Sequence, residues 1–394
     1  RKWHKIARRR YLTGIVCVDV AVLIAFKALG VFVSGSLLPL GISFYLFKMI
    51  SYQADLYRGE ITDSPGFMDT ALYFMVFPQI AQGPIMRYEE GRTYALRYYS
   101  LEGFEDGLQY FVIGLSMKVL LADRLAILWK DLQMIGYQSI STPLAWLGAV
   151  GYSLQLYFDF WGYSLMASGL MVMLGFDFIE NFHHPYASKS ISEFYRRWHM
   201  TLGSWFRDYV YFPMGGSRGS SGRTAVNLMI TFLVSGLWHG AGWHYVVWGA
   251  IHGSYQVAGR GIRYVSEAAQ KKLPEKKIRF FSEKTQGLTR ATRICVTFIL
   301  TDFAWLFFRA DHLGRAVAML RRIVQNGNWL GQFSDGTLFG MGLCRLEVCQ
   351  LALAIGVLLV VDILHESGIS IRAWLAKQVL VIRWSIYMLV LLGF

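Results

Sequence analysis

Charged residues are scarce in this chain: only 16% of its 394 residues are Asp, Glu, Lys or Arg, whereas ordinary soluble domains carry roughly a quarter. Hydrophobic residues make up 54%, and they include 27 Phe, 22 Tyr and 13 Trp. A soluble protein of this size has no single core large enough to bury so much apolar surface. A polytopic membrane protein turns that surface toward lipid and places Trp and Tyr at the two interfaces. The composition therefore favours an integral membrane protein.

Cysteine is also scarce, and the four present are too few and too irregularly spaced for a disulfide framework. Cys344 and Cys349 lack the CxxC spacing of a zinc site, so small buried residues are the preferred interpretation. The sequence has no HExxH motif, and Glu180, His183 and His184 fall around NFHHP, which is typical of a turn. We therefore predict no metal site.

Acidic residues are outnumbered, which gives a net charge of +13. The Lys and Arg residues lie in short stretches between apolar runs, where they set membrane orientation and meet anionic head groups. Arg1–Arg10 carries six of them and is expected on the cytoplasmic side. Gly259–Arg293, with KKLPEKKIR, is predicted to be a solvated cytoplasmic loop. The expected partner is thus the lipid bilayer and not nucleic acid.

The apolar runs predict roughly eight to ten membrane segments, since about 20 residues suffice to span a bilayer. Leu37–Gly59 and Phe67–Arg87 contain Pro, Gly and polar residues, which indicates broken or re-entrant segments shielded by protein. The expected spans are Leu12–Val33, Leu108–Trp129, Pro143–Gly175, Tyr245–Val257, Ile294–Phe308, Val348–Val361 and Val379–Phe394. No soluble second domain or repeat is visible, so residues 1–394 are predicted to form a single membrane domain, clipped at one or both ends.

Histidines cluster in the middle of the chain. If the nine histidines were evenly scattered, about one or two would fall in the window from His183 to His252. Six of the nine lie there: His183, His184, His199, His239, His244 and His252. A histidine among membrane segments is costly and tends to be retained for a task. This window is therefore the predicted site.

A helix is predicted to start near Ile191, because Ser190 and Glu193 have the spacing of a capping box. One face carries the apolar residues Ile191, Phe194, Tyr195, Trp198, Leu202, Trp205 and Phe206, and the other carries Glu193, Arg196, Arg197, Ser204 and Arg207. This pattern predicts one helix lying in the membrane interface. His199 falls at the margin of the apolar stripe. This position fits an interfacial histidine without a chemical role as well as it fits an active one.

The following stretch, RDYVYFPMGGSRGSSGR, predicts a flexible basic loop, because Pro213, Gly215 and Gly216 stop regular structure. Its Arg218 and Arg223 could grip a phosphate or the phosphopantetheine arm of a donor, or simply face solvent at a cytoplasmic turn. The stretch lacks the GK[ST] ending of a nucleotide-binding P-loop.

His239 lies in SGLWHGAGWH, where glycines leave room for a substrate or another helix to approach the imidazole. A neutral imidazole is a natural general base for a hydroxyl proton. Asp159, inside the apolar run LQLYFDFWGYS, is either a functional carboxylate or a structural hydrogen-bonding group.

The order of these motifs, from LPLGISFYLFKMISYQADLYRG through FPQIAQGPIMR, LQLYFDFWGYS and ENFHHPYASKSISEFYRRWHMTLGSWFRDYVYFPMGGSR to WHGAGWHYVVWG, resembles the membrane-bound O-acyltransferases, and within them the alginate O-acetyltransferase branch. The resemblance covers about Leu38–Tyr255. It implies an all-α integral membrane fold: a polytopic ring of helices, with re-entrant and interfacial helices, around a central funnel in the bacterial cell membrane.

The resemblance also implies an activity. An acyl group, acetyl above all, passes from a cytoplasmic thioester (acetyl-CoA or an acyl carrier protein, with no bound cofactor) to hydroxyls of a cell-surface polysaccharide. Transfer is direct or through an extracellular acyltransferase or esterase-like partner. The alternatives are D-alanyl transfer to teichoic acid and a polysaccharide transporter or flippase.

The family's two functional histidines correspond to His239, in Trp-His-Gly, and His199, in Arg-Arg-Trp-His. The predicted substrate- and donor-binding residues are Arg196, Arg197, Trp198, Trp238, Asp159 and Asp208. One departure leaves the acceptor open: Leu165 follows Ser164 where the alginate branch often has an acidic residue.

Overall fold

The computed structural model describes residues 2–33, 39–62, 66–91, 99–137, 139–270, 275–325, 342 and 344–369, together with 374, 377–382 and 385. Within these ranges every regular element is helical, which confirms the all-α prediction. The chain divides into two compact units. The main unit comprises Arg1–Leu115 and Phe160–Arg321, and the smaller unit comprises Ser116–Asp159 and Arg322–Phe394.

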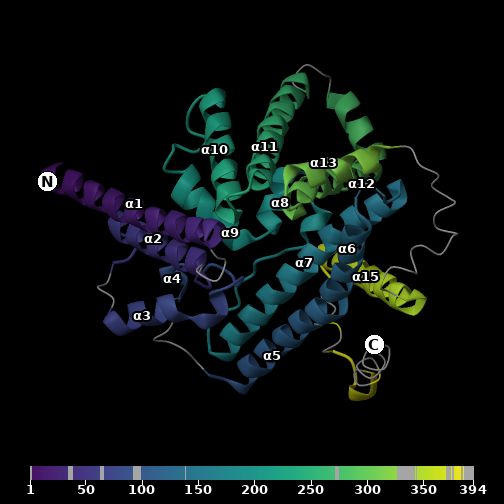
Figure 1. Cartoon of the computed structure of the whole chain (residues 1–394), viewed down its shortest axis with the longest axis horizontal. Helices are drawn as coiled ribbons and strands as arrows, with labels where there is room; N and C mark the ends of the chain where they lie inside the picture. The colour runs from purple at the N-terminus through teal and green to yellow at the C-terminus, as the bar shows by residue number, and fades with distance from the viewer. Residues whose placement is uncertain are drawn as a thin grey trace. The chain divides into compact units, whose positions relative to one another are not determined.

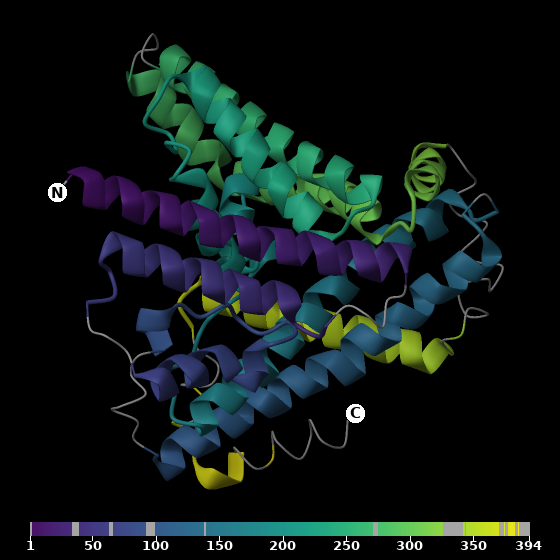
Figure 2. The same cartoon turned by 60° about the vertical axis from the view of Figure 1, so that its left-hand side comes forward.

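The first part of the main unit begins with two long helices that lie side by side, α1 (Lys2–Phe32) and α2 (Ile42–Arg58) (Figures 1 and 2). Shorter elements follow: α3 (Phe67–Met75), the 3-10 turn η2 (Phe77–Gln79) and α4 (Tyr88–Gly91). The predicted break in Phe67–Arg87 is confirmed, because α3 ends before Pro78. Helix α2 is continuous from Ile42 to Arg58, so the predicted break in Leu37–Gly59 is wrong for that part, while the re-entrant alternative stays a prediction.

Glycines bring α5 (Leu101–Ser116) and α7 (Thr142–Met173) into backbone contact within the main unit (Figure 1). A Cβ atom on Gly107 would meet the carbonyl oxygen of Gly169, and one on Gly114 would meet that of Gly162. Both positions therefore require glycine if the helices are to keep this separation.

The rest of the main unit carries the histidine window. Two short helices, α8 (Ile191–Arg197) and α9 (Met200–Phe206), lead through the π-helical turn η6 (Arg207–Tyr211) to α10 (Ser221–His239). Helices α10 and α11 (Trp243–Gln270) pack against each other, and α12 (Glu275–Arg309) packs against α11 (Figures 1 and 2). An amphipathic helix that the sequence did not predict, α13 (Leu313–Val324), follows.

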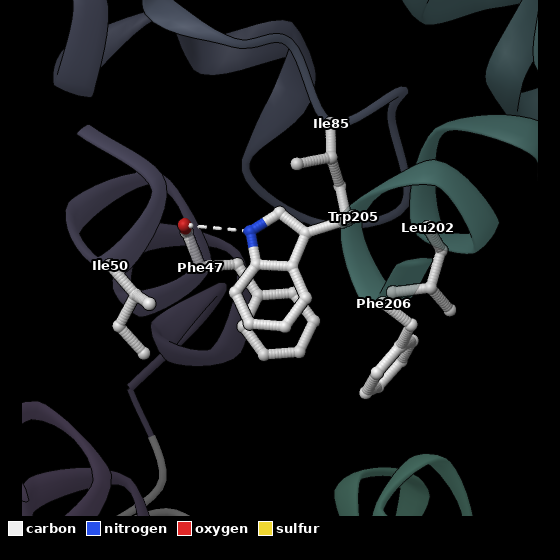
Figure 3. Packing of buried hydrophobic residues seen from close by; sticks show 6 residues of the cluster. All are labelled: Phe47, Ile50, Ile85, Leu202, Trp205 and Phe206. Atoms are coloured by element: carbon white, nitrogen blue, oxygen red, sulfur yellow. Dashed lines mark hydrogen bonds between the residues drawn. The ribbon is translucent and has the colours of Figure 1, made fainter. Parts of the chain in front are cut away.

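A compact apolar cluster joins α9 to α2 (Figure 3). The Trp205 ring stacks on Phe47 with centroids 3.8 Å apart, and its Nε1–H donates to the Phe47 carbonyl at 3.0 Å. Ile50 of α2, Ile85 of the loop before α4, and Leu202 and Phe206 of α9 complete the cluster. The indole hydrogen bond gives the contact a fixed orientation in addition to its apolar burial.

The smaller unit contains the π-helical turn η4 (Met117–Ala122), α6 (Asp123–Ile135), the first part of α7 and α15 (Arg345–Glu366). Trp129 of α6 packs against Tyr152 of α7 with ring centroids 5.3 Å apart. Lys118 Nζ forms ion pairs with Asp123 at 2.5 Å and with Asp159 at 2.7 Å.

Three of the described helices are long and apolar enough to cross a membrane: Ala7–Gly30, Thr289–Arg309 and Arg345–Glu366. They overlap the expected spans Leu12–Val33, Ile294–Phe308 and Val348–Val361. The expected span Val379–Phe394 lies mostly outside the described residues.

The solvated loop predicted for Gly259–Arg293 is wrong for its described part. Helix α11 continues to Gln270 and α12 begins at Glu275, so the backbone is helical on both sides of residues 271–274. Lys, Glu, Arg and Gln are good helix formers, and a polar composition therefore does not by itself indicate a loop.

Candidate active site

The predicted interfacial helix is interrupted at His199. It begins as expected, because Ser190 Oγ accepts the backbone N–H of Glu193 at 3.2 Å. The chain then breaks between α8 and α9, and His199 adopts φ 43° and ψ 57°. This left-handed region is rare for residues other than glycine, and its non-glycine occupants often lie at functional sites. The prediction of one continuous helix is therefore wrong at the residue of greatest interest.

The break is held by the segment that precedes α8. The backbone N–H of Met200 donates to the Asn181 carbonyl at 2.9 Å, and that of His183 donates to the Arg197 carbonyl at 2.9 Å. These bonds satisfy groups that a continuous helix would pair internally. The unusual backbone of His199 is thus fixed from both sides.

The Asn181 side chain determines the tautomer of His199. Its Oδ1 accepts the backbone N–H of Thr201 at 3.2 Å, and its Nδ2 donates to Ser164 Oγ at 3.1 Å. A backbone N–H can only donate, so the oxygen must face Thr201 and also His199 Nδ1, which lies 3.1 Å away. Nδ1 of His199 therefore carries the proton, and Nε2 keeps a lone pair.

The surroundings of His199 are aromatic. The Phe160 ring is nearly perpendicular to the imidazole with centroids 4.6 Å apart, and the Phe182 ring is nearly parallel to it with centroids 6.4 Å apart. Burial, and secondarily the neighbouring His239, lowers the pKa of His199 to about 3. The imidazole is therefore neutral at physiological pH. Its buried Nε2 has no hydrogen-bond partner among the described residues and can act only as an acceptor.

His239 is the last residue of α10 and lies among aromatic rings. Its imidazole is 4.9 Å from the Phe308 ring, 5.2 Å from Trp248 and 6.4 Å from Tyr245, measured between centroids. The side chain is half-buried, unlike His199, which is 3% exposed. Of the two histidines, His239 is therefore the one that a substrate can approach more directly.

The predicted close approach around His239 is confirmed for the neighbouring helix. A Cβ atom on Gly236 would meet the Tyr245 carbonyl oxygen, and one on Gly249 would meet the Phe232 carbonyl oxygen. Helices α10 and α11 thus touch backbone to backbone, one turn before His239. The two glycines set the distance between His239 and the side chains of α11.

The predicted donor-binding residues have different surroundings. Arg196 is exposed, whereas Arg197 forms an ion pair with Glu193 at 3.0 Å. Trp198 is buried and packs on Trp305 with centroids 5.1 Å apart. Among these three predicted positions of α8 and its end, only Arg196 presents its charged group openly to solvent.

Trp238 lies between the apolar cluster and His239. Its ring stacks on Phe47 at 5.2 Å and is 4.6 Å from the His239 ring, and Lys27 Nζ is 5.7 Å from its centroid. The indole therefore connects the conformation of His239 to α1 and α2.

Asp208 forms ion pairs with Arg87 and with Arg207, whose Nε lies 2.8 Å away. These bonds hold the pKa of Asp208 below its usual value although burial alone would raise it. Asp208 is thus a paired carboxylate. Asp159 belongs to the smaller unit, where it pairs with Lys118.

The glycine- and serine-rich turn after η6 is more ordered than its composition indicates. Asn227 Nδ2 donates to the carbonyl oxygens of Met214 at 3.2 Å and Gly216 at 2.9 Å. Arg218 and Arg223 are exposed, so the turn presents two cations to solvent from a fixed backbone. Both interpretations of the basic stretch stay open.

His183 and His184, two further histidines of the window, have different surroundings. His183 is exposed and pairs with Glu180 at 2.8 Å, and His184 adopts φ 44° before Pro185. In the described part of the chain, no group of three or more His, Cys, Asp or Glu residues could hold a metal ion.

Sequence reasoning missed Asn181 as a functional residue. It opens NFHHP, but nothing in that motif indicates that its amide reaches the backbone break at residue 199. Its contacts to Ser164 and Thr201 cross 17 and 20 positions of the chain. Such contacts follow from the tertiary fold and leave no local periodic signal.

Residues 49–272 match the sequence model of the membrane-bound O-acyltransferase family. The chain belongs to this family. Asn181, His199 and His239 all lie within the matched range.

Relatives of this chain include probable alginate O-acetylases and a peptidoglycan O-acetyltransferase. The chain is 38% identical over 366 residues to a probable alginate O-acetylase of Azotobacter vinelandii, and the match covers 88% of this chain and 69% of the relative. It is 39% identical over 326 residues to the probable alginate O-acetylase of Pseudomonas aeruginosa, and this match covers 81% of this chain and 58% of the relative. A peptidoglycan O-acetyltransferase of Helicobacter pylori is 32% identical over 339 residues, covering 79% and 59%. The chain thus spans about 58 to 69% of the length of these relatives.

Proposed function

We propose that this protein is an integral membrane O-acyltransferase that moves an acetyl group from a thioester donor on the cytoplasmic side to hydroxyls of a cell-surface polysaccharide. Transfer is direct or proceeds through an extracellular acyltransferase or esterase-like partner. The protein is multi-pass in the bacterial cell membrane, with its helices in a ring around a central funnel. The observation that carries the proposal is that His199 and His239 lie near enough for His239 to contribute to lowering the pKa of His199, and that both fall within the family-matched range.

The proposed reaction needs one general base. His239 takes the proton from the acceptor hydroxyl while the hydroxyl oxygen attacks the thioester carbonyl. The tetrahedral intermediate then expels the thiolate as the carbon–sulfur bond breaks. The thiolate receives the proton from His239, so the products are an oxygen ester and a free thiol. No external proton donor is required.

His199 orients the reacting groups. Because its Nε2 bears a lone pair, it accepts a hydrogen bond from the acceptor hydroxyl or from a protonated His239. A neutral imidazole in this tautomer offers no N–H at Nε2 and so does not stabilise a developing oxyanion there. Orientation is therefore the role that we propose for His199.

Basic side chains serve the donor. Arg196 is exposed and lies close to His199 in the sequence. We propose that it binds the phosphates of a CoA or acyl carrier donor. Arg197 forms an ion pair with Glu193 and is proposed to contact the donor in the same site after a small adjustment of that ion pair.

Acetyl transfer is preferred over D-alanyl transfer. A teichoic acid D-alanyltransferase of Bacillus subtilis is 31% identical over 54% of this chain, whereas the Azotobacter alginate O-acetylase is 38% identical over 88%. The acceptor polysaccharide is left open by Leu165, which stands where the alginate branch often has an acidic residue.

The proposal is tested with His239→Ala in membranes of cells that carry the polysaccharide. We expect ester formation to fall by about 10²–10⁴-fold, the usual contribution of a general base. His244→Ala is the matched control, because it removes a nearby imidazole that the mechanism does not use. Wild-type ester content in His239→Ala, with membrane insertion confirmed, would refute the assignment.

A further inference from the structure

Four side chains beside His239 carry buried polar atoms that the mechanism does not use. They are the indole nitrogens of Trp248 and Trp305, the hydroxyl of Tyr195 and both ring nitrogens of His252. None of these atoms has a hydrogen-bond partner among the described residues. Trp248 and Trp305 are 3% and 2% exposed, and His252 is fully buried.

These side chains form one connected cluster. The His252 ring lies 4.9 Å from Trp248, 5.2 Å from Tyr195 and 6.1 Å from Trp305, measured between centroids. Trp248 in turn lies 5.2 Å from the ring of His239. The cluster therefore begins at the proposed general base and continues inward along α11.

Such a concentration of unpaired groups has a physical meaning. Buried donors and acceptors are almost always hydrogen-bonded, because leaving them dry costs free energy. A neutral imidazole needs one donor and one acceptor partner, and each indole needs one acceptor. Small oxygen-bearing molecules meet all of these needs, and a buried water commonly does so. An alkyl chain meets none of them.

We propose that Tyr195, Trp248, His252 and Trp305 line a hydrated acyl subsite that limits the donor to short chains. The inference rests on the proposed function, since it places the acyl group of the thioester beside His239. An acetyl group leaves the water on these polar atoms in place. A longer acyl chain displaces that water and leaves the polar atoms dry, so its transfer is disfavoured.

The test measures thiol release from acetyl-CoA, butyryl-CoA and octanoyl-CoA in membranes of cells that carry both the polysaccharide and its acyl-transferring partner proteins. The double variant Tyr195→Phe/His252→Leu removes polar atoms while keeping side-chain bulk. We expect the ratio of octanoyl to acetyl turnover to rise at least tenfold, equivalent to about 1.4 kcal/mol. Tyr195→Phe alone removes one hydroxyl and is expected to shift the ratio in the same direction, which covers poor folding of the double variant.

Tyr255→Phe is the control. Its ring also contacts His252, with centroids 5.8 Å apart, but its hydroxyl is not one of the buried unpaired atoms, so the ratio should not change. An unchanged ratio in Tyr195→Phe and in a folded double variant, with turnover still dependent on His239, would overturn the subsite alone. Absence of His239-dependent turnover with every thioester in the wild type would overturn the proposed function itself.

Discussion

Replacing Asn181 tests the link between the break at His199 and the chemistry. In Asn181→Leu, the backbone N–H of Thr201 and the Nδ1–H of His199 both lose their acceptor. A buried donor left unpaired costs about 1–3 kcal/mol. The two together cost about 2–6 kcal/mol, a large part of the 5–15 kcal/mol that stabilises a typical domain. We expect a clear loss of thermal stability in detergent.

Asn181→Asp separates stability from function, because a carboxylate still accepts both hydrogen bonds. In the wild type, burial lowers the pKa of His199 to about 3, so the ring stays neutral between about pH 5 and 8. A carboxylate in contact with the ring favours the protonated form and raises that pKa. Protonation turns Nε2 into a donor and removes the proposed acceptor.

The assay is thiol release in membranes across about pH 5.5–8.5. We expect the rate of Asn181→Asp to fall at least about tenfold toward the acidic end, because at one pH unit below its pKa a group is mostly protonated. His199 of the wild type does not titrate in that range. Ser164→Ala is the control, since it removes the partner of Nδ2 and leaves the Oδ1 bonds intact. A wild-type rate and pH profile in Asn181→Asp would show that the lone pair on Nε2 does not matter.

Two further substitutions test the packing and the second unit. Gly249→Ala places a Cβ atom against the Phe232 carbonyl and should lower both thermal stability and turnover. Gly259→Ala is the control on the same helix, because open space surrounds that position. In thermal unfolding it should be neutral or stabilising by up to about 1 kcal/mol. Asp159→Asn should lower the free energy of unfolding by less than about 1 kcal/mol, because its partner Lys118 is partly exposed and keeps its ion pair with Asp123. A large loss of turnover without loss of stability would instead assign Asp159 to the site.

Local signals in the sequence predicted the helical class and many element positions. The capping box at Ser190 placed the start of α8, and the proline in Phe67–Arg87 placed the end of α3. Composition was less informative: the charged stretch 259–293 is helical in its described part, although its polarity had indicated a loop.

The candidate site shows a similar division. His239 could be chosen from its glycine neighbours and the family motif, and the approach of α11 to Gly236 agrees with that choice. The left-handed backbone of His199 could not be predicted, because its apolar neighbours continue the helical period across the break. It depends on hydrogen bonds from residues 181 and 183, which only the folded chain brings into reach.

The position of His239 at the end of α10 has an energetic consequence for the reaction. The peptide dipoles of a helix add up to a partial negative charge at its C-terminus, which favours a cation there by about 0.3–1 kcal/mol and by up to about 2 kcal/mol where the site is partly buried. The imidazole becomes a cation only while it holds the acceptor's proton. Helix α10 therefore favours the protonated imidazole of the transition state over the neutral imidazole of the resting enzyme, and it offsets part of the cost that burial, which lowers the pKa of His239 to about 3, imposes on the cation.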